Sequence, residues 1–178
     1  AKIVSVNPLP EIGVERFKNP QDFLNPPKAF KTLLGDGARL SDLWIQPRIA
    51  GDLAFLKGLM KAMLEAEAAR PGTVFDHDFI RDHTSGFAEF AADLAATSWE
   101  EIVAGSGVTR ESIQAAAEIA MASRATIVCW AMGLTQQPEA VATIQQVVNF
   151  LLLRGNLGRP GAGVCPVRGH SNVQGDRT

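Results

Sequence analysis

The most unusual stretch of the sequence is a glycine-rich segment close to its carboxyl end, over residues 155–178. The polar and small residues that draw attention there are Arg168, Gly169, His170, Asn172 and Gln174. Glycines let backbone N–H groups approach an anion closely, and a guanidinium offers a rigid pair of donors to a carboxylate or a phosphate. A solvated loop without function is the alternative, but such a loop does not need a cation and amides at alternate positions. The segment predicts a loop that binds an anionic cofactor or substrate.

Three further groups of residues follow predicted strands, where ligands bind in open parallel sheets. Asn7 follows the first strand, and is either a turn former or a residue placed to hold a ribose hydroxyl. Gly51 and Asp52 stand at the start of a predicted helix, where the carboxylate either caps the helix or accepts two donors from a guanine edge. The third group comprises Met132, Gly133 and Gln136.

These residues need a scaffold of strands that alternate with amphipathic helices. Apolar runs predict strands over 2–6, 42–46 and 125–130, and apolar stripes predict helices over 52–69 and 110–122 and a long helix that starts at Pro138. This alternation favours an α/β fold, a three-layer Rossmann-like parallel sheet with helices on both faces. Residues 1–178 then form one nucleotide-binding-type domain. Residues 10–37, rich in proline and charge, are interpreted as a surface insertion with at most one helical turn.

Composition excludes several classes of protein. The 178 residues include 46% hydrophobic ones, enough for one sizeable core, and their 17 basic and 19 acidic residues form no stripe that suggests nucleic acid or a membrane as partner. Cys129 in a buried strand and Cys165 in a loop are too few for a disulfide framework and indicate a reduced, cytoplasmic setting. The sequence starts directly in a strand and stops in a glycine-rich run, and we expect a piece of a longer protein.

Residues 151–175 resemble the hallmark segment of formate dehydrogenase-like enzymes in the dimethyl sulfoxide reductase family of molybdopterin oxidoreductases. Residues 130–136 are similar to the partner loop of that segment, at the spacing that the family uses. Residues 5–8 and 43–54 are similar to two loops that hold the guanine dinucleotide. The resemblance covers nearly the whole chain except the stretch at about 10–37.

The resemblance implies a molybdenum ion held between two molybdopterin guanine dinucleotides. The matched cofactor-binding residues are Asn7, Gly51, Asp52, Met132, Gly133, Gln136, Gly169, Asn172 and Gln174. Asn7 departs from the family pattern, which has an acidic residue there. Arg168 matches the arginine beside the metal that steadies an anionic substrate, and His170 replaces a glutamine common in formate dehydrogenases. His170 either relays a proton or, as a neutral imidazole, donates a hydrogen bond to the pterin. Because of this departure, the resemblance does not identify the substrate.

The resemblance also implies what must come from elsewhere. The metal ligand, and an iron–sulfur cluster where one is present, belong to the part of such enzymes before this segment, and we expect no metal ligand within it. The expected partners are a small anionic substrate, the remaining domains of the same polypeptide and an electron-transfer protein. Two other classes stay open: a module for another nucleotide such as NAD, which the missing Gly-x-Gly-x-x-Gly turn disfavours, and a domain that has lost its site.

Overall fold

The computed structural model describes residues 1–19, 21, 24–35 and 37–167, apart from the side chains of residues 12, 14, 31 and 32. The chain divides into two compact units, Ala1–Pro47 and Arg48–Thr178, which are described separately below.

The first unit is built on two short strand pairs. Strands β1 (Val4–Val6) and β4 (Leu43–Ile45) are parallel, with Ser5 opposite Trp44. Strands β2 (Arg16–Phe17) and β3 (Ala38–Arg39) are antiparallel. The hydroxyl groups of Ser5 and Ser41, both buried, are hydrogen-bonded to each other. Both strands of the parallel pair confirm predictions from the sequence, and each is two residues shorter than expected.

The proline-rich stretch contains more helix than predicted. It holds α1 (Ile12–Glu15) and the nine-residue helix α2 (Pro26–Leu34), so the prediction of at most one helical turn is wrong. Proline fits the first turn of a helix because its missing N–H would have no intrahelical partner there. The helix starts at a pair of prolines, and Ala29 N–H already donates to Asn25 O at 2.7 Å. Prolines that the sequence suggested as helix breakers are therefore helix starters.

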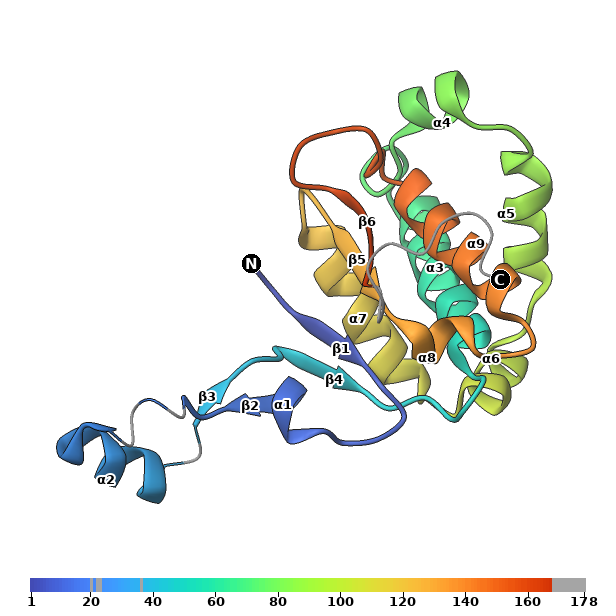
Figure 1. Ribbon diagram of the computed structural model, residues 1–178. Helices are drawn as coiled ribbons and strands as arrows, with labels where there is room; N and C mark the ends of the chain where they lie inside the picture. Colours follow the sequence, from blue (N-terminus) through green and yellow to red (C-terminus); the bar gives the residue numbers. More distant parts are fainter. Residues whose placement is uncertain (20, 22–23, 36, 168–178) are drawn as a thin grey trace, which may run out of the picture. The chain divides into compact units, whose positions relative to one another are not determined.

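The second unit contains seven helices and one strand pair within the described residues (Figure 1). The helices are α3 (Asp52–Ala69), α4 (His77–His83), α5 (Phe87–Ala96), α6 (Trp99–Ser106), α7 (Arg110–Ala122), α8 (Met132–Thr135) and α9 (Ala140–Leu152). The strands are β5 (Ile127–Trp130) and β6 (Gly163–Pro166).

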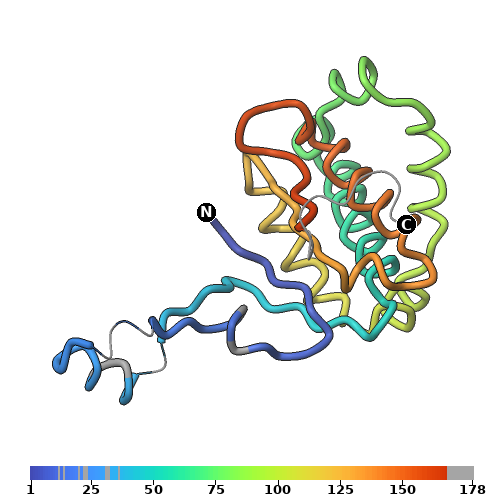
Figure 2. Tube along the Cα trace, in the orientation of Figure 1, coloured from blue at the N-terminus to red at the C-terminus, as the bar shows by residue number. Residues whose placement is uncertain are grey.

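Helix α3 is the centre of this unit and packs against α5, α6, α7 and α9 (Figure 2). Its bounds are those that the sequence predicted. Met60 and Met63 are completely buried, and Gly58 is so close to α6 and α7 that a Cβ atom there would lie 2.6 Å from Cγ2 of Ile102. Burial of large side chains and close helix contact on several sides stabilise α3 and fix its position along its axis.

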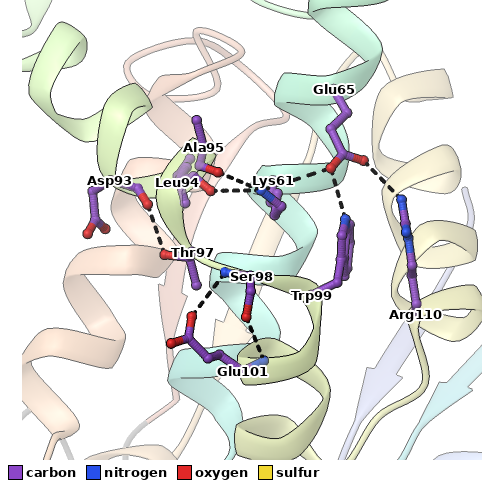
Figure 3. A network of polar contacts seen from close by, with 10 residues as sticks. All are labelled: Lys61, Glu65, Asp93, Leu94, Ala95, Thr97, Ser98, Trp99, Glu101 and Arg110. Carbon is purple, nitrogen blue, oxygen red and sulfur yellow. Dashed lines mark hydrogen bonds and ion pairs between the residues drawn. The ribbon is translucent and has the colours of Figure 1, made fainter.

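A network of polar side chains joins α3 to its neighbours (Figure 3). Glu65 accepts hydrogen bonds from Trp99 Nε1 at 2.8 Å and from the Arg110 guanidinium at 3.5 Å. Lys61 is buried, and its ammonium group donates to the carbonyl oxygens of Leu94 and Ala95 in the last turn of α5. Carbonyl groups at a helix end lack intrahelical partners, so this lysine satisfies groups that burial would otherwise leave without hydrogen bonds.

Side-chain caps fix the starts of two helices, α6 and α7. Ser98 and Glu101 form a capping box in which each side chain accepts from the other residue's backbone N–H, at 3.1 and 3.0 Å (Figure 3). The Thr109 hydroxyl accepts from Ser112 N–H at the start of α7. Such caps stabilise a helix by about 1 kcal/mol each.

Helix α9 starts at Ala140, two residues after Pro138. Its buried face includes Val147 and Phe150, while Val141 is 73% exposed.

Strands β5 and β6 form a parallel pair in which Cys129 lies opposite Cys165 and Trp130 opposite Pro166. Mixed helices and strands with small parallel sheets agree with the α/β class. Within the described residues, however, the strands form three two-stranded sheets, and the predicted three-layer sheet is not confirmed. No helix among these residues has the length and apolar character needed to cross a bilayer.

The chain leaves α9 through a closely packed turn. Gly155 has a φ of 56°, and a Cβ atom there would lie 2.6 Å from an Asp76 carboxylate oxygen. The guanidinium of Arg154 donates to the carbonyl oxygens of Val74, Met121 and Ser123. This one side chain therefore joins the connections that follow α3, α7 and α9.

A buried carboxylate organises the loop that follows α3. Glu67 is 7% exposed and accepts from the backbone N–H groups of Gly72, Val74 and Phe75 and from His77 Nε2 at 2.7 Å. Burial alone would raise the pKa of Glu67, but the hydrogen bonds from His77 and the three amides outweigh it and lower the pKa to about 2. The ionised carboxylate thus stabilises this loop.

We expect Glu67→Gln to loosen the loop over residues 72–77, because an amide oxygen is a weaker acceptor and its NH2 group would face backbone donors. Amide hydrogen exchange in peptides that cover this loop should become roughly tenfold faster or more. Hydrogen exchange with mass spectrometry on the complete protein measures this locally. Glu118→Gln, at an exposed position on α7, is the matched control and should leave the exchange unchanged.

The same variant tests the pH dependence. Because the folded pKa of Glu67 is depressed from 4.5 to about 2, its contribution to stability is complete above pH 4.5 and is lost as the pH falls towards 2. The protection of the loop, corrected for intrinsic exchange, should fall across this window in the wild type and much less in the variant. Equal pH dependence in both proteins would contradict this role of the carboxylate.

Candidate functional site

The turn before α3 is fixed by a close approach of two backbone segments. Arg48 N–H donates to Ser106 O at 2.8 Å, and Gly51 N–H donates to Arg48 O at 2.9 Å. A Cβ atom on Gly51 would lie 2.7 Å from Ser106 O and 2.9 Å from Arg48 O. Ala50 has a φ of 63°, in the left-handed region. Only glycine fits at position 51, and the tight turn sets where the next side chain, Asp52, stands.

Asp52 is the first residue of α3 and is half-buried. The N-cap position belongs to Gly51, and no side chain caps this helix end, so the interpretation of Asp52 as the cap is wrong. A carboxylate in the first turn is favoured by the helix dipole and by the free N–H groups there. Instead of capping, the carboxylate accepts a hydrogen bond at Oδ2 from Gln137 Nε2 at 3.0 Å.

The segment 132–137 meets the start of α3 through this hydrogen bond. Residues 132–135 form α8, a single helical turn directly after β5 (Figure 1). Gln137 Nε2 also donates to Gly133 O at 3.3 Å, so its amide group links α8 to Asp52. Met132, Gly133 and Gln136 are exposed. The structure thus brings together two of the groups that the sequence selected for cofactor binding.

Gln137 is a site residue that the sequence analysis missed. Two glutamines stand side by side before Pro138, and the sequence pattern gives no measure of which of them turns inward. The structure leaves Gln136 exposed and Gln137 half-buried against Asp52. The available signal was the proline, which restricts the backbone of the residue before it.

Asn7 lies in the first unit, directly after β1. Its backbone N–H continues the strand pair by donating to Ile45 O at 3.0 Å, and its side-chain amide donates to Leu9 O at 2.7 Å. These are the contacts of a turn former, which was one of the two interpretations of this residue. Its contact with a nucleotide stays a prediction.

The residues predicted for catalysis and for much of the cofactor contact lie outside the described part of the chain: Arg168, Gly169, His170, Asn172 and Gln174. The structure does describe the chain up to Val167, whose N–H donates to Trp130 O at 2.7 Å. Residue 167 therefore lies beside the carboxyl end of β5, where α8 begins. Strand ends of this kind are where parallel sheets bind ligands.

The two cysteines lie side by side on β5 and β6, and both are exposed; the prediction that Cys129 is buried is wrong. Partial burial and the hydrogen bond to Cys165 both raise the pKa of the Cys129 thiol. Among the described residues, no three His, Cys, Asp or Glu side chains cluster closely enough to hold a metal ion.

The structure presents the Asp52 carboxylate next to α8, a short helix that follows a strand. Comparison with known proteins shows which proteins are similar to this chain. The chain is 47% identical over its whole length to an uncharacterized oxidoreductase of Mycobacterium tuberculosis and spans 22% of that protein. Formate dehydrogenase H of Escherichia coli is 31% identical over 138 residues, which are 78% of this chain and 18% of the enzyme.

A solved structure supports the fold. Acetylene hydratase from Pelobacter acetylenicus has a TM-score of 0.62 with this chain at 16% identity, over 90% of this chain and 18% of that one. No family model matches the sequence. The chain spans about a fifth of the length of the relatives named here. The chain is thus similar to segments of larger proteins that include oxidoreductases.

We expect Gly51→Ala to disturb the turn that sets Asp52, because the new methyl group would meet two backbone oxygens that cannot move aside independently. Overpacking of this kind costs roughly 1–3 kcal/mol. Thermal unfolding of the complete protein measures it.

Ala50→Gly provides the opposite control at the neighbouring position. Its φ of 63° suits glycine better than alanine, so this variant should be neutral or up to about 1 kcal/mol more stable. A Gly51→Ala variant as stable as the wild type would show that the turn tolerates a side chain and does not constrain Asp52.

Proposed function

We propose that this chain is part of a molybdenum bis(molybdopterin guanine dinucleotide) oxidoreductase that carries out two-electron redox chemistry on a small anionic substrate, in the manner of formate dehydrogenases. Similarity to formate dehydrogenase H and to an uncharacterized oxidoreductase supports the class of chemistry. The observation that carries the assignment of this segment is the hydrogen bond between Asp52 and Gln137, because it unites the two segments expected to hold one dinucleotide.

The described residues fit a guanine dinucleotide. Asp52 offers a half-buried carboxylate at a helix start, and the two oxygens of a carboxylate pair well with the two parallel donors of a guanine edge. Gly51 keeps the backbone beside it free of side-chain atoms, and Met132, Gly133 and Gln136 present an exposed surface on α8. The bound cofactor would supply the redox chemistry, while these residues bind and orient it.

The substrate would be held by the glycine-rich segment 155–178. By the family resemblance, the Arg168 guanidinium holds the substrate anion close to the reacting centre, where a low dielectric strengthens charge pairing. His170 either relays the accompanying proton or donates a hydrogen bond to the pterin. Gly169, Asn172 and Gln174 complete the cofactor contacts, and Asn7 adds a contact to the nucleotide.

The organisation around this site is also part of the proposal. Residues 1–178 would form one nucleotide-binding-type domain whose strand pairs belong to a three-layer sheet in the complete enzyme, with residues 10–37 as a surface insertion. Other domains would provide the metal ligand, further cofactor contacts and an iron–sulfur cluster where one exists. We place the enzyme in the cytoplasm because the two cysteines of this chain are free thiols. Its expected redox partner is an electron-transfer protein.

Arg168→Ala in the complete enzyme should keep the molybdenum content and lose turnover by orders of magnitude, because the substrate anion would lose its charge partner. Metal analysis and a turnover assay with formate and other small anions measure the two quantities separately. Arg70→Ala, at an exposed position, is the control. Normal turnover of the Arg168→Ala variant would remove this residue from the mechanism.

Asp52→Asn should lower the amount of guanine dinucleotide that the purified enzyme retains, because an amide cannot accept two donors on two oxygens. Guanine nucleotide released by acid treatment, per mole of protein, gives the cofactor content. Glu111→Gln is the matched control, since Glu111 also stands in the first turn of a helix. Equal cofactor content in all three proteins would assign Asp52 to the helix dipole alone.

A further inference from the structure

The side-chain NH2 group of Gln137 makes two hydrogen bonds. A glutamine NH2 group has two N–H donors, and Nε2 of Gln137 reaches two acceptors: Asp52 Oδ2 at 3.0 Å and Gly133 O at 3.3 Å. Within the described residues, the Asp52 carboxylate accepts no other hydrogen bond. One carboxylate oxygen is therefore occupied, and the other, Oδ1, has no partner among these residues.

The position of this amide is set by the backbone around it. Gln136 N–H donates to Met132 O at 3.0 Å, closing α8, and Ala140 N–H donates to Gln137 O at 3.1 Å. Pro138 restricts the backbone of Gln137 further. The side chain starts from a constrained backbone and folds back onto α8, so its contact with Asp52 is part of the local structure rather than one of many surface rotamers.

We infer that Gln137 stands in for guanine: its amide occupies the Asp52 oxygen while the site is empty, and the guanine edge must displace it. This inference rests on the proposed function. A guanine edge presents a ring N–H and an amino N–H side by side, and pairing both with Asp52 requires both carboxylate oxygens. A base with one donor can use the free Oδ1 and leave Gln137 in place.

Gln137 is thus a specificity-determining residue that acts through Asp52. In the empty protein it keeps the half-buried carboxylate hydrogen-bonded, which lowers the free energy of the empty state and so weakens binding of any ligand that must displace it. A ligand that breaks the hydrogen bond between Gln137 and the charged Asp52 to form its own binds about three- to tenfold more weakly than it would without Gln137. This loss of affinity applies to ligands with two adjacent donors and not to ligands with one.

The test uses the complete protein produced in cells that cannot make the molybdenum cofactor, so that the site is empty. Calorimetry with GDP and with inosine diphosphate, which lacks the amino group of guanine, gives affinities for a two-donor and a one-donor base. In Gln137→Met, of similar length without donors, GDP should bind about three- to tenfold more tightly than in the wild type. Inosine diphosphate should bind with unchanged affinity.

Two further variants complete the design. Gln145→Met, at an exposed position on α9, should bind both nucleotides like the wild type. Gln137→Asn withdraws the amide by one methylene group, should also tighten GDP binding, and carries the test if Gln137→Met does not fold. Equal or weaker GDP binding in the Gln137 variants, or a parallel change for both nucleotides, overturns the inference while the guanine site stands. Absence of GDP binding by every variant and by the wild type overturns the guanine site itself.

Discussion

Everything described in the second unit depends on the burial of one helix. Helix α3 contacts four neighbouring helices and carries completely buried methionines, so its start cannot shift without disturbing packing along its whole length. The turn before it is equally constrained, since the Gly51 backbone lies too close to Ser106 O for a side chain. A half-buried carboxylate at position 52 is thereby held in place by packing at a distance from the site.

Local signals in the sequence predicted much of this scaffold. Thr109 caps the helix predicted over residues 110–122, and the bounds of α3 agree with its apolar stripe. Such features are predictable because capping and amphipathic burial act over a few residues. The helix that starts at Pro26 was missed, since proline in sequence signals both a break and a helix start.

The candidate site was predictable only in part. Gly51, Asp52 and the 132–136 segment were selected from resemblance and position, but the choice between Gln136 and Gln137 depends on the direction of a side chain after a one-turn helix. Likewise, the exposure of Cys129 depends on what packs against β5 rather than on the strand's own composition. Long-range packing determines both the direction of the Gln137 side chain and the exposure of Cys129, and a local sequence pattern does not predict such packing. Two interpretations compete with the proposed function: a module for another nucleotide such as NAD, which the missing Gly-x-Gly-x-x-Gly turn disfavours, and a domain that has lost its site.

The parallel pairing of β5 with β6 makes residue spacing itself a constraint. Gly163 to Pro166 are matched one by one with Ile127 to Trp130, and Arg154 ties the chain down before this strand by three carbonyl contacts. Side chains on a strand alternate between faces. Losing one residue between Arg154 and Gly163 would turn each following strand residue to the opposite face. Val167 would then also be shifted by one position relative to β5. This connection can therefore change its residue types far more freely than its length.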